Sequence, residues 1–352
     1  MALSQKLDSW YTDFGRTLPW RGIDNPYRIW LSEIILQQTR IEQGRDYYHR
    51  FVEAFPDVQA LAAASEEQVL RLWQGLGYYS RARNMHAAAQ YIVRELGGTF
   101  PSTYEGIARL KGVGRYTAAA VASFAFRLPH PVIDGNVYRF ISRLYGIATP
   151  IATDAAYREF EALLLKHIDR RRPDRFNAAL MDFGSLQCKP KPDCTACPFA
   201  DECVALGTGK VDLLPVRMPK AQVKHRFFYY FHICWKEGDT TCTFMQRRQG
   251  RDIWRGLFEF PLLETEGAIP DDGLHARVLD FLKQSFGITH AGLTISDEHR
   301  HQLTHRTIHA RFIAAELPEE PPFHPSNSLR MTCQEIKNTP LPRLIDRYLH
   351  SL

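Results

Sequence analysis

Two carboxylates in the sequence stand where an acid and a base could act on one substrate. Glu33 lies in PYRIWLSEIILQQTR, where Pro26 suits the first turn of a helix and most of Glu33's neighbours are apolar. A buried glutamate loses hydration, so its pKa rises, as a general acid near neutral pH requires. An exposed structural glutamate is the alternative. Asp134, in VIDGNVYR, either caps the helix that follows or presents its charge to a substrate.

Four of the seven cysteines stand within sixteen residues, in the run CKPKPDCTACPFADEC. These four are Cys188, Cys194, Cys197 and Cys203. Clustered thiolates are typical ligands of zinc or of an iron–sulfur cluster. A zinc ribbon uses two close cysteine pairs, whereas this run has one close pair with wider gaps on both sides. The spacing therefore favours a [4Fe–4S] cluster over zinc.

A glycine-rich turn between two short predicted helices could hold a phosphate. Within residues 103–126 the turn contains Lys111, Gly112, Val113 and Gly114. Glycines let the backbone approach a ligand closely, and the next helix presents its first N–H groups and the positive end of its dipole. Such a helix-hairpin-helix would hold the DNA backbone without reading sequence. A tight helical turn without a ligand is the alternative.

The sequence pattern changes along the chain, which predicts that these candidate residues belong to two domains of different secondary structure. Residues 1–208 show helical spacing of apolar residues, with glycine and proline between the segments. Residues 209–226 carry prolines and an excess of Lys and Arg, which predicts an extended basic linker. Residues 227–352 contain aromatic and β-branched runs and one amphipathic segment at 273–286. We therefore expect a multidomain protein, with an all-α domain followed by an α+β domain.

Composition restricts the class of protein. The 352 residues carry 44 Lys and Arg against 39 Asp and Glu, a net charge of +5 that allows nucleic acid as a partner without establishing it. No stretch has the length of a membrane span, and the first residues do not resemble a signal peptide. We expect a cytoplasmic monomer that does not bind membranes, associated with the nucleoid if the source is bacterial.

The combination of a helix-hairpin-helix, VIDGNV and a four-cysteine run resembles the endonuclease III superfamily of DNA glycosylases. The segments LPWR, WLSEIILQQTR, GLGYYSRARN and LKGVGRYTAAA, with GLFEFP in a second domain, resemble the MutY-type adenine DNA glycosylases within it. The resemblance implies double-stranded DNA as partner, with adenine opposite 8-oxoguanine or guanine as target. It further implies hydrolysis of the N-glycosidic bond of the adenine, which starts base-excision repair.

The resemblance assigns roles to individual residues. Glu33 matches the acid that protonates adenine at N7, and Asp134 matches the carboxylate that stabilises the oxocarbenium-like sugar. Tyr116 and Asn136 match residues that orient Asp134 and the attacking water. Tyr116 stands where the strand-cleaving relatives carry a lysine, so we expect a monofunctional glycosylase.

Further residues match DNA-binding positions. Trp20 and Arg21 correspond to the pocket wall, and Asp182 to an acid that binds the adenine edge. The target base must leave the stack, and the residues matched to a wedge beside the orphan base are Gln38, Thr39 and Tyr78.

The second domain resembles the Nudix-like domain of this family, which recognises 8-oxoguanine through a Phe-Ser-His loop. The corresponding residues are Leu303, Thr304 and His305, so the aromatic ring is missing. The segment 273–287 lacks the glutamates that would hold magnesium, and we expect no nucleotide hydrolysis. The first cysteine gap is also one residue shorter than usual. The alternatives are an endonuclease III-like glycosylase/lyase and a non-catalytic mismatch-binding protein.

Overall fold

The chain forms two compact units in a computed structural model that describes residues 2–219, 222–250 and 252–352. Unit 1 comprises Met1–Ala64 and Asn84–Pro219, and unit 2 comprises Ser65–Arg83 and Lys220–Leu352. The predicted helical domain, residues 1–208, includes the segment 65–83, whereas the contacts of this segment group it with the C-terminal unit. No helix among the described residues is long and apolar enough to cross a bilayer.

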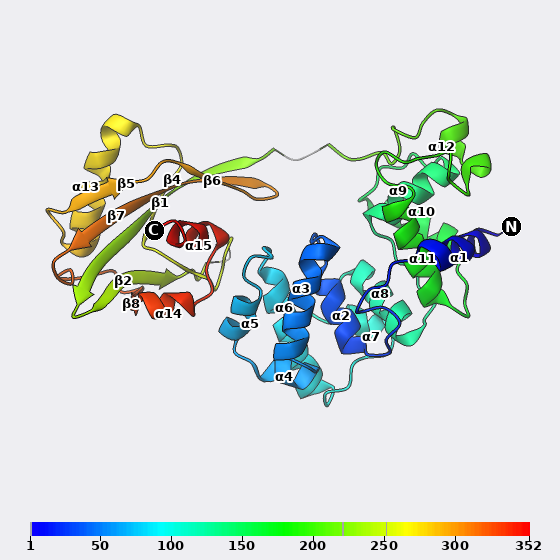
Figure 1. Cartoon of the computed structure of the whole chain (residues 1–352), viewed down its shortest axis with the longest axis horizontal. Helices are drawn as coiled ribbons and strands as arrows, with labels where there is room; N and C mark the ends of the chain where they lie inside the picture. Colours follow the sequence, from blue (N-terminus) through cyan, green and yellow to red (C-terminus); the bar gives the residue numbers. More distant parts are fainter. Residues whose placement is uncertain (1, 220–221, 251) are drawn as a thin grey trace. The chain divides into compact units, whose positions relative to one another are not determined.

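Unit 1 is helical, as predicted (Figure 1). Its elements are α1 (Leu3–Phe14), α2 (Pro26–Ile35), α3 (Ile41–Ala54), α4 (Val58–Ala63), α7 (Tyr104–Ala108), α8 (Arg115–Phe126), α9 (Gly135–Tyr145), α10 (Asp154–Leu165), α11 (Pro173–Leu186), η1 (Ala200–Glu202) and α12 (Val204–Gly207). Helix α6 (Ser80–Glu95) begins in unit 2 and continues into unit 1.

Local sequence explains where the important helices begin. Asn25 accepts a hydrogen bond from the Arg28 backbone and Pro26 occupies the first turn, so α2 begins where the sequence predicted. The predicted helix-hairpin-helix is confirmed as α7, a turn and α8. Helices α1, α9, α10 and α11 share one apolar core, in which Phe140 and Phe183 pack with ring centroids 4.4 Å apart.

Unit 2 contains a mixed sheet in which β1 and β7 run parallel and the other described pairs are antiparallel. Its elements are α5 (Glu66–Leu72), β1 (Lys224–Glu237), β2 (Thr240–Arg247), β3 (Phe258–Glu259), β4 (Leu262–Thr265), α13 (Asp271–Phe286), β5 (Gly292–Ile295), β6 (His299–Gln302), β7 (Arg306–Leu317), β8 (Ser328–Thr332), α14 (Cys333–Lys337) and α15 (Arg343–Leu349). The predicted α+β character is confirmed.

Both faces of the sheet are covered, which explains the continuous apolar run in β1. Alternate residues such as Phe231 and Trp235 pack with α13, whose Val278 is fully buried. On the opposite face, Tyr348 of α15 stacks on Phe312 with ring centroids 3.9 Å apart.

The first half of the expected linker belongs to unit 1. The Arg143 guanidinium donates to the carbonyl oxygens of Val211 and Leu214, and Ile151 forms a β-bridge with Arg217. Strand β1 already begins at Lys224. Residues 220 and 221 of the expected linker lie outside the described residues.

Candidate active site

One cavity of about 350 Å³ in unit 1 gathers the carboxylates predicted to do chemistry. Its walls include Glu33 from α2, Tyr116 from α8, and Asp134 and Asn136 at the start of α9. Three predicted DNA-contacting residues also line it: Trp20, Arg21 and Thr39. Residues separated by about a hundred positions in the sequence therefore meet at one place.

Glu33 is buried, as the apolar run around it predicted. Glu33 is 6% exposed, and neighbouring Trp30 is fully buried. Burial raises the pKa of Glu33 to about 7, partly opposed by the Tyr116 hydroxyl, which donates to the carboxylate, and by the Arg21 charge. The Asp134 charge adds to the rise. This carboxyl can therefore hold a proton near neutral pH and release it within the cavity.

Asp134 is held in a different environment, at the N-terminus of α9. One carboxylate oxygen accepts the backbone N–H groups of Asn136 and Val137, both at 2.8 Å, and the other accepts the Asn136 side-chain amide at 2.8 Å. Burial raises the pKa of Asp134 above its usual value, while these donors and Arg139 lower it. The helix cap that the sequence allowed thus coexists with a carboxylate facing the cavity.

The Asn136 side-chain amide is itself held in place by Arg139. Arg139 donates to the Asn136 side-chain oxygen at 2.9 Å, to the Cys188 carbonyl at 2.7 Å and to the Gly184 carbonyl. Gly184 permits this packing, because a Cβ at that position would lie 2.5 Å from the Asn136 carbonyl oxygen. Sequence reasoning did not identify Arg139 or Gly184, since neither carries a local signal.

Asp182 does not line this cavity. Asp182 is fully buried, and its carboxylate accepts hydrogen bonds from the two terminal guanidinium nitrogens of Arg21, at 2.8 and 2.9 Å. It also accepts the backbone N–H and two side-chain nitrogens of Arg16. Burial alone would raise the pKa of Asp182, but the bonds from Arg21 and Arg16 hold it below its usual value. Asp182 thus fixes two cations on the cavity wall; the contact with adenine stays a prediction.

The hairpin turn exposes its backbone. Lys111, Gly112 and Gly114 are exposed and Val113 is half-buried. Gly112 has φ +81°, a conformation that favours glycine. Gly114 caps α8 without a side-chain hydrogen bond, so the first N–H groups of α8 have no side-chain acceptor from the cap. These groups suit a phosphate oxygen.

All four clustered cysteines line one cavity with apolar neighbours and Arg143. The Arg143 guanidinium lies 3.6 Å from the Cys188 sulfur and donates to the carbonyl oxygens of Lys189 and Pro190. Burial raises the pKa of the Cys188 thiol, and the Arg143 charge opposes that rise. Four cysteine sulfurs around one cavity are the donor set of an iron–sulfur centre. Over the described residues, no three His, Cys, Asp or Glu side chains stand close enough together to hold a single metal ion as they are.

A second cavity, of about 550 Å³, lies within unit 2. Tyr78 lines it together with Leu303, Thr304 and His305, which form the turn between β6 and β7. Tyr78 is 46% exposed, has φ +48° and is thus held in a conformation that non-glycine residues seldom adopt. Gln38, also matched to the wedge, is an exposed residue of unit 1 with φ +57°.

Comparison with known proteins assigns both units to families. Residues 31–166 match the model of the HhH-GPD superfamily base excision DNA repair protein, and residues 229–351 match the NUDIX domain. An adenine DNA glycosylase of Buchnera aphidicola subsp. Baizongia pistaciae is 33% identical over 311 residues, which cover 87% of this chain and 83% of the relative. The chain belongs to the adenine DNA glycosylase family. The mouse member of the family is 41% identical over 61% of this chain and 44% of its own length.

Solved structures agree with the fold of unit 1. A thermostable thymine-DNA glycosylase matches with a TM-score of 0.55 and 25% identity, over 58% of this chain and 95% of that chain. A trapped complex of endonuclease III with DNA matches with a TM-score of 0.52 at 22% identity, which shows the shared fold alone. The predicted family and fold class are confirmed, and the chain is a DNA glycosylase by family.

The Asp182 pairs generate a stability prediction. The D182N variant leaves the Arg16 and Arg21 guanidiniums without a buried counter-charge, and we expect a loss of about 3 kcal/mol in the free energy of unfolding. Because folding lowers the pKa of Asp182 from its usual 3.8, this difference is complete above that pH and shrinks as the pH falls below it. Urea unfolding followed by helical circular dichroism measures it.

The matched control is D154N, which breaks an exposed pair with Arg115 in the same unit. We expect a loss below about 1 kcal/mol there. Equal losses in the two variants, or a D182N effect independent of pH, would contradict the assignment.

Proposed function

We propose that this chain removes adenine paired with 8-oxoguanine or guanine in double-stranded DNA, by hydrolysis without strand cleavage. The observation that carries the proposal is the shared cavity of Glu33 and Asp134, where one carboxyl has its pKa raised to about 7 and the other accepts three hydrogen bonds. Two carboxylates in unlike environments suit acid catalysis and charge stabilisation at one glycosidic bond.

The residues divide the reaction between them. Glu33 gives its proton to adenine, at N7 in our proposal, so that the protonated base accepts the electrons of the breaking N-glycosidic bond and leaves as neutral adenine. Asp134 stabilises the positive charge that develops on the sugar, and water completes the hydrolysis at the anomeric carbon. Tyr116 donates to Glu33 and Asn136 donates to Asp134, so both hold the carboxylates in place. Tyr116 has no amine and forms no Schiff base with the sugar.

DNA contacts follow from the same assignment. The exposed hairpin at 111–114 holds a phosphate, and Gln38, Thr39 and Tyr78 take the space left when the adenine leaves the stack. Trp20, Arg21 and Asp182 form and brace the adenine pocket. The turn formed by Leu303, Thr304 and His305 recognises 8-oxoguanine, with the hydroxyl and imidazole as polar groups.

We further propose that Cys188, Cys194, Cys197 and Cys203 hold a [4Fe–4S] cluster. Their common cavity, the adjacent Arg143 and the family assignment support this. A bound cluster would cross-link residues 188–203 and so order the backbone to which Arg139 and Arg143 donate.

Single-turnover adenine release tests the proposed reaction. Duplexes carrying adenine opposite 8-oxoguanine, guanine or thymine are incubated with the protein and then treated with alkali to reveal abasic sites. We expect release from the first two duplexes and none from the third. E33Q and D134N should bind the first duplex but lose release by at least about a hundredfold. The control E53Q, at an exposed glutamate of α3, should retain it.

Omission of alkali tests for strand cleavage. We expect intact strands, and no covalent protein–DNA product in the presence of borohydride, because a Schiff base is not formed. Strand cleavage with a trapped adduct would support the glycosylase/lyase alternative. Binding without release from any duplex would support the non-catalytic alternative.

Metal analysis tests the cluster. The purified protein should contain iron and acid-labile sulfide in equal amounts, and C197A should lose both. C333A, at an exposed cysteine outside the four-cysteine run, should retain them. Stoichiometric zinc without iron would overturn the proposal.

A further inference from the structure

Two segments far apart in the sequence line the unit 2 cavity: the turn Leu303–His305, called here the reading turn, and the run Asp252, Ile253 and Trp254. Residues 252–254 follow β2, about fifty positions before Thr304 in the sequence, and sequence reasoning assigned them no role. They lie in the same cavity as the turn formed by Leu303, Thr304 and His305.

Trp254 is held in an unusual conformation. Its φ is +59°, which is uncommon for a bulky side chain and persists only where the surroundings enforce it. Trp254 is 9% exposed. Its ring packs edge-on against the rings of Phe228 and His301, with centroid distances of 6.1 and 5.6 Å. Phe228 supports the ring from the sheet, and His301 lines the cavity beside it.

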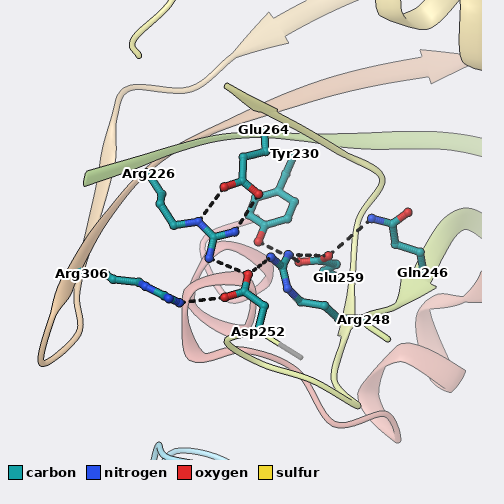
Figure 2. Close-up of polar contacts among 8 residues, drawn as sticks. All are labelled: Arg226, Tyr230, Gln246, Arg248, Asp252, Glu259, Glu264 and Arg306. Atoms are coloured by element: carbon teal, nitrogen blue, oxygen red, sulfur yellow. Dashed lines mark hydrogen bonds and ion pairs between the residues drawn. The ribbon is translucent and has the colours of Figure 1, made fainter. Parts of the chain in front are cut away.

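Asp252 is hydrogen-bonded to three arginines, one of which adjoins the reading turn (Figure 2). One of its carboxylate oxygens accepts from Arg306 at 2.7 Å, and Arg306 directly follows the reading turn. The other accepts from Arg226 at 2.6 Å and Arg248 at 2.9 Å. Asp252 therefore joins the Trp254 segment to the base of the turn through charge-assisted bonds.

The partners of Asp252 are fixed in turn. Arg226 donates to both oxygens of Glu264, at 2.6 and 2.8 Å, and Arg248 donates to both oxygens of Glu259, at 2.8 and 2.9 Å. Glu259 is 2% exposed and also accepts from the Tyr230 hydroxyl, as Figure 2 shows. The network is anchored in the sheet, so the spacing between Trp254 and the turn is set by the fold rather than by a loose loop.

We propose that Trp254 is a specificity-determining residue of the lesion-reading cavity, and that Asp252 is its positioning residue. Resting on the proposed function, this assigns to the indole the stacking surface for the oxidised purine opposite adenine. Stacking does not by itself distinguish 8-oxoguanine from guanine. It retains a purine that Thr304 and His305 have engaged, and so it strengthens binding of the lesion more than binding of guanine.

The test compares binding to two duplexes, with adenine opposite 8-oxoguanine and adenine opposite guanine, in the E33Q background so that no turnover occurs. We expect W254L to weaken binding of the 8-oxoguanine duplex by at least about fivefold, as loss of one base–aromatic contact would. Binding of the guanine duplex should weaken less, so that the preference for 8-oxoguanine falls. W254F keeps a ring and should retain most of the preference. D252N should also reduce the preference, because the Trp254 segment loses its charge-assisted bonds to Arg306 at the base of the turn.

The matched control is W235F, at a tryptophan that is 2% exposed and packs on the α13 face of the same sheet. It should leave the preference unchanged even if it lowers thermal stability. An unchanged preference in folded W254L would overturn the proposal. Adenine release by the otherwise unmodified chain separates this failure from a failure of the proposed function.

If W254L does not fold, intrinsic fluorescence of the native chain and of W254F provides a second test. Quenching of intrinsic fluorescence should be larger with the 8-oxoguanine duplex than with the guanine duplex, and W254F should lose that difference. A difference that persists in W254F would show that another tryptophan reports the lesion and would overturn the proposal.

Discussion

The burial of one carboxyl group is the constraint on which the active site depends. Glu33 lies on an apolar helix whose neighbouring Trp30 is fully buried, and desolvation moves its pKa to about 7. An isolated charge in that position would be unfavourable, so the cavity must either protonate the group or surround it with donors. The Tyr116 hydroxyl donates to the carboxylate, but burial outweighs this bond, and the pKa of about 7 allows both the protonated and the ionised form near neutral pH.

Asp134, the second carboxylate, is stabilised by hydrogen-bond donors rather than by protonation. Asp134 is bound by two backbone N–H groups and the Asn136 amide at the start of a helix, where the dipole also favours negative charge. Arg139 then fixes Asn136 and donates to the backbone at Cys188. Asp134, proposed as the catalytic carboxylate, is therefore connected to the cysteine loop through Asn136 and Arg139 of α9. A change in the backbone at Cys188 would act on Asp134 through these two residues.

Local patterns explain why much of the site could be predicted. The cap at Asp134, the helix start at Pro26 and the hairpin glycines are each encoded within a few residues, and the structure places them as expected. The burial of Glu33 followed from its apolar neighbours. The run of four cysteines was equally visible from spacing alone.

The missed features depend on contacts between distant residues. Asp182 pairs with Arg16 across 166 positions, so its buried position could not be read from LMDFGSLQC. Asp252 is joined to Arg306 across 54 positions, and Trp254 shows no signal except as one aromatic residue near a glycine. The segment 65–83 carries helical spacing that fits either unit, and only its packing places it in unit 2.

The protonation state of Glu33 is the most direct test of this account. Infrared difference spectra between the native protein and E33Q, recorded from pH 4 to pH 9, isolate the carboxyl stretch of this residue. The account predicts a protonated carboxyl band that disappears with a midpoint near 7. A midpoint near the usual 4.5 would show that Glu33 is ionised at neutral pH and would contradict its role as the acid.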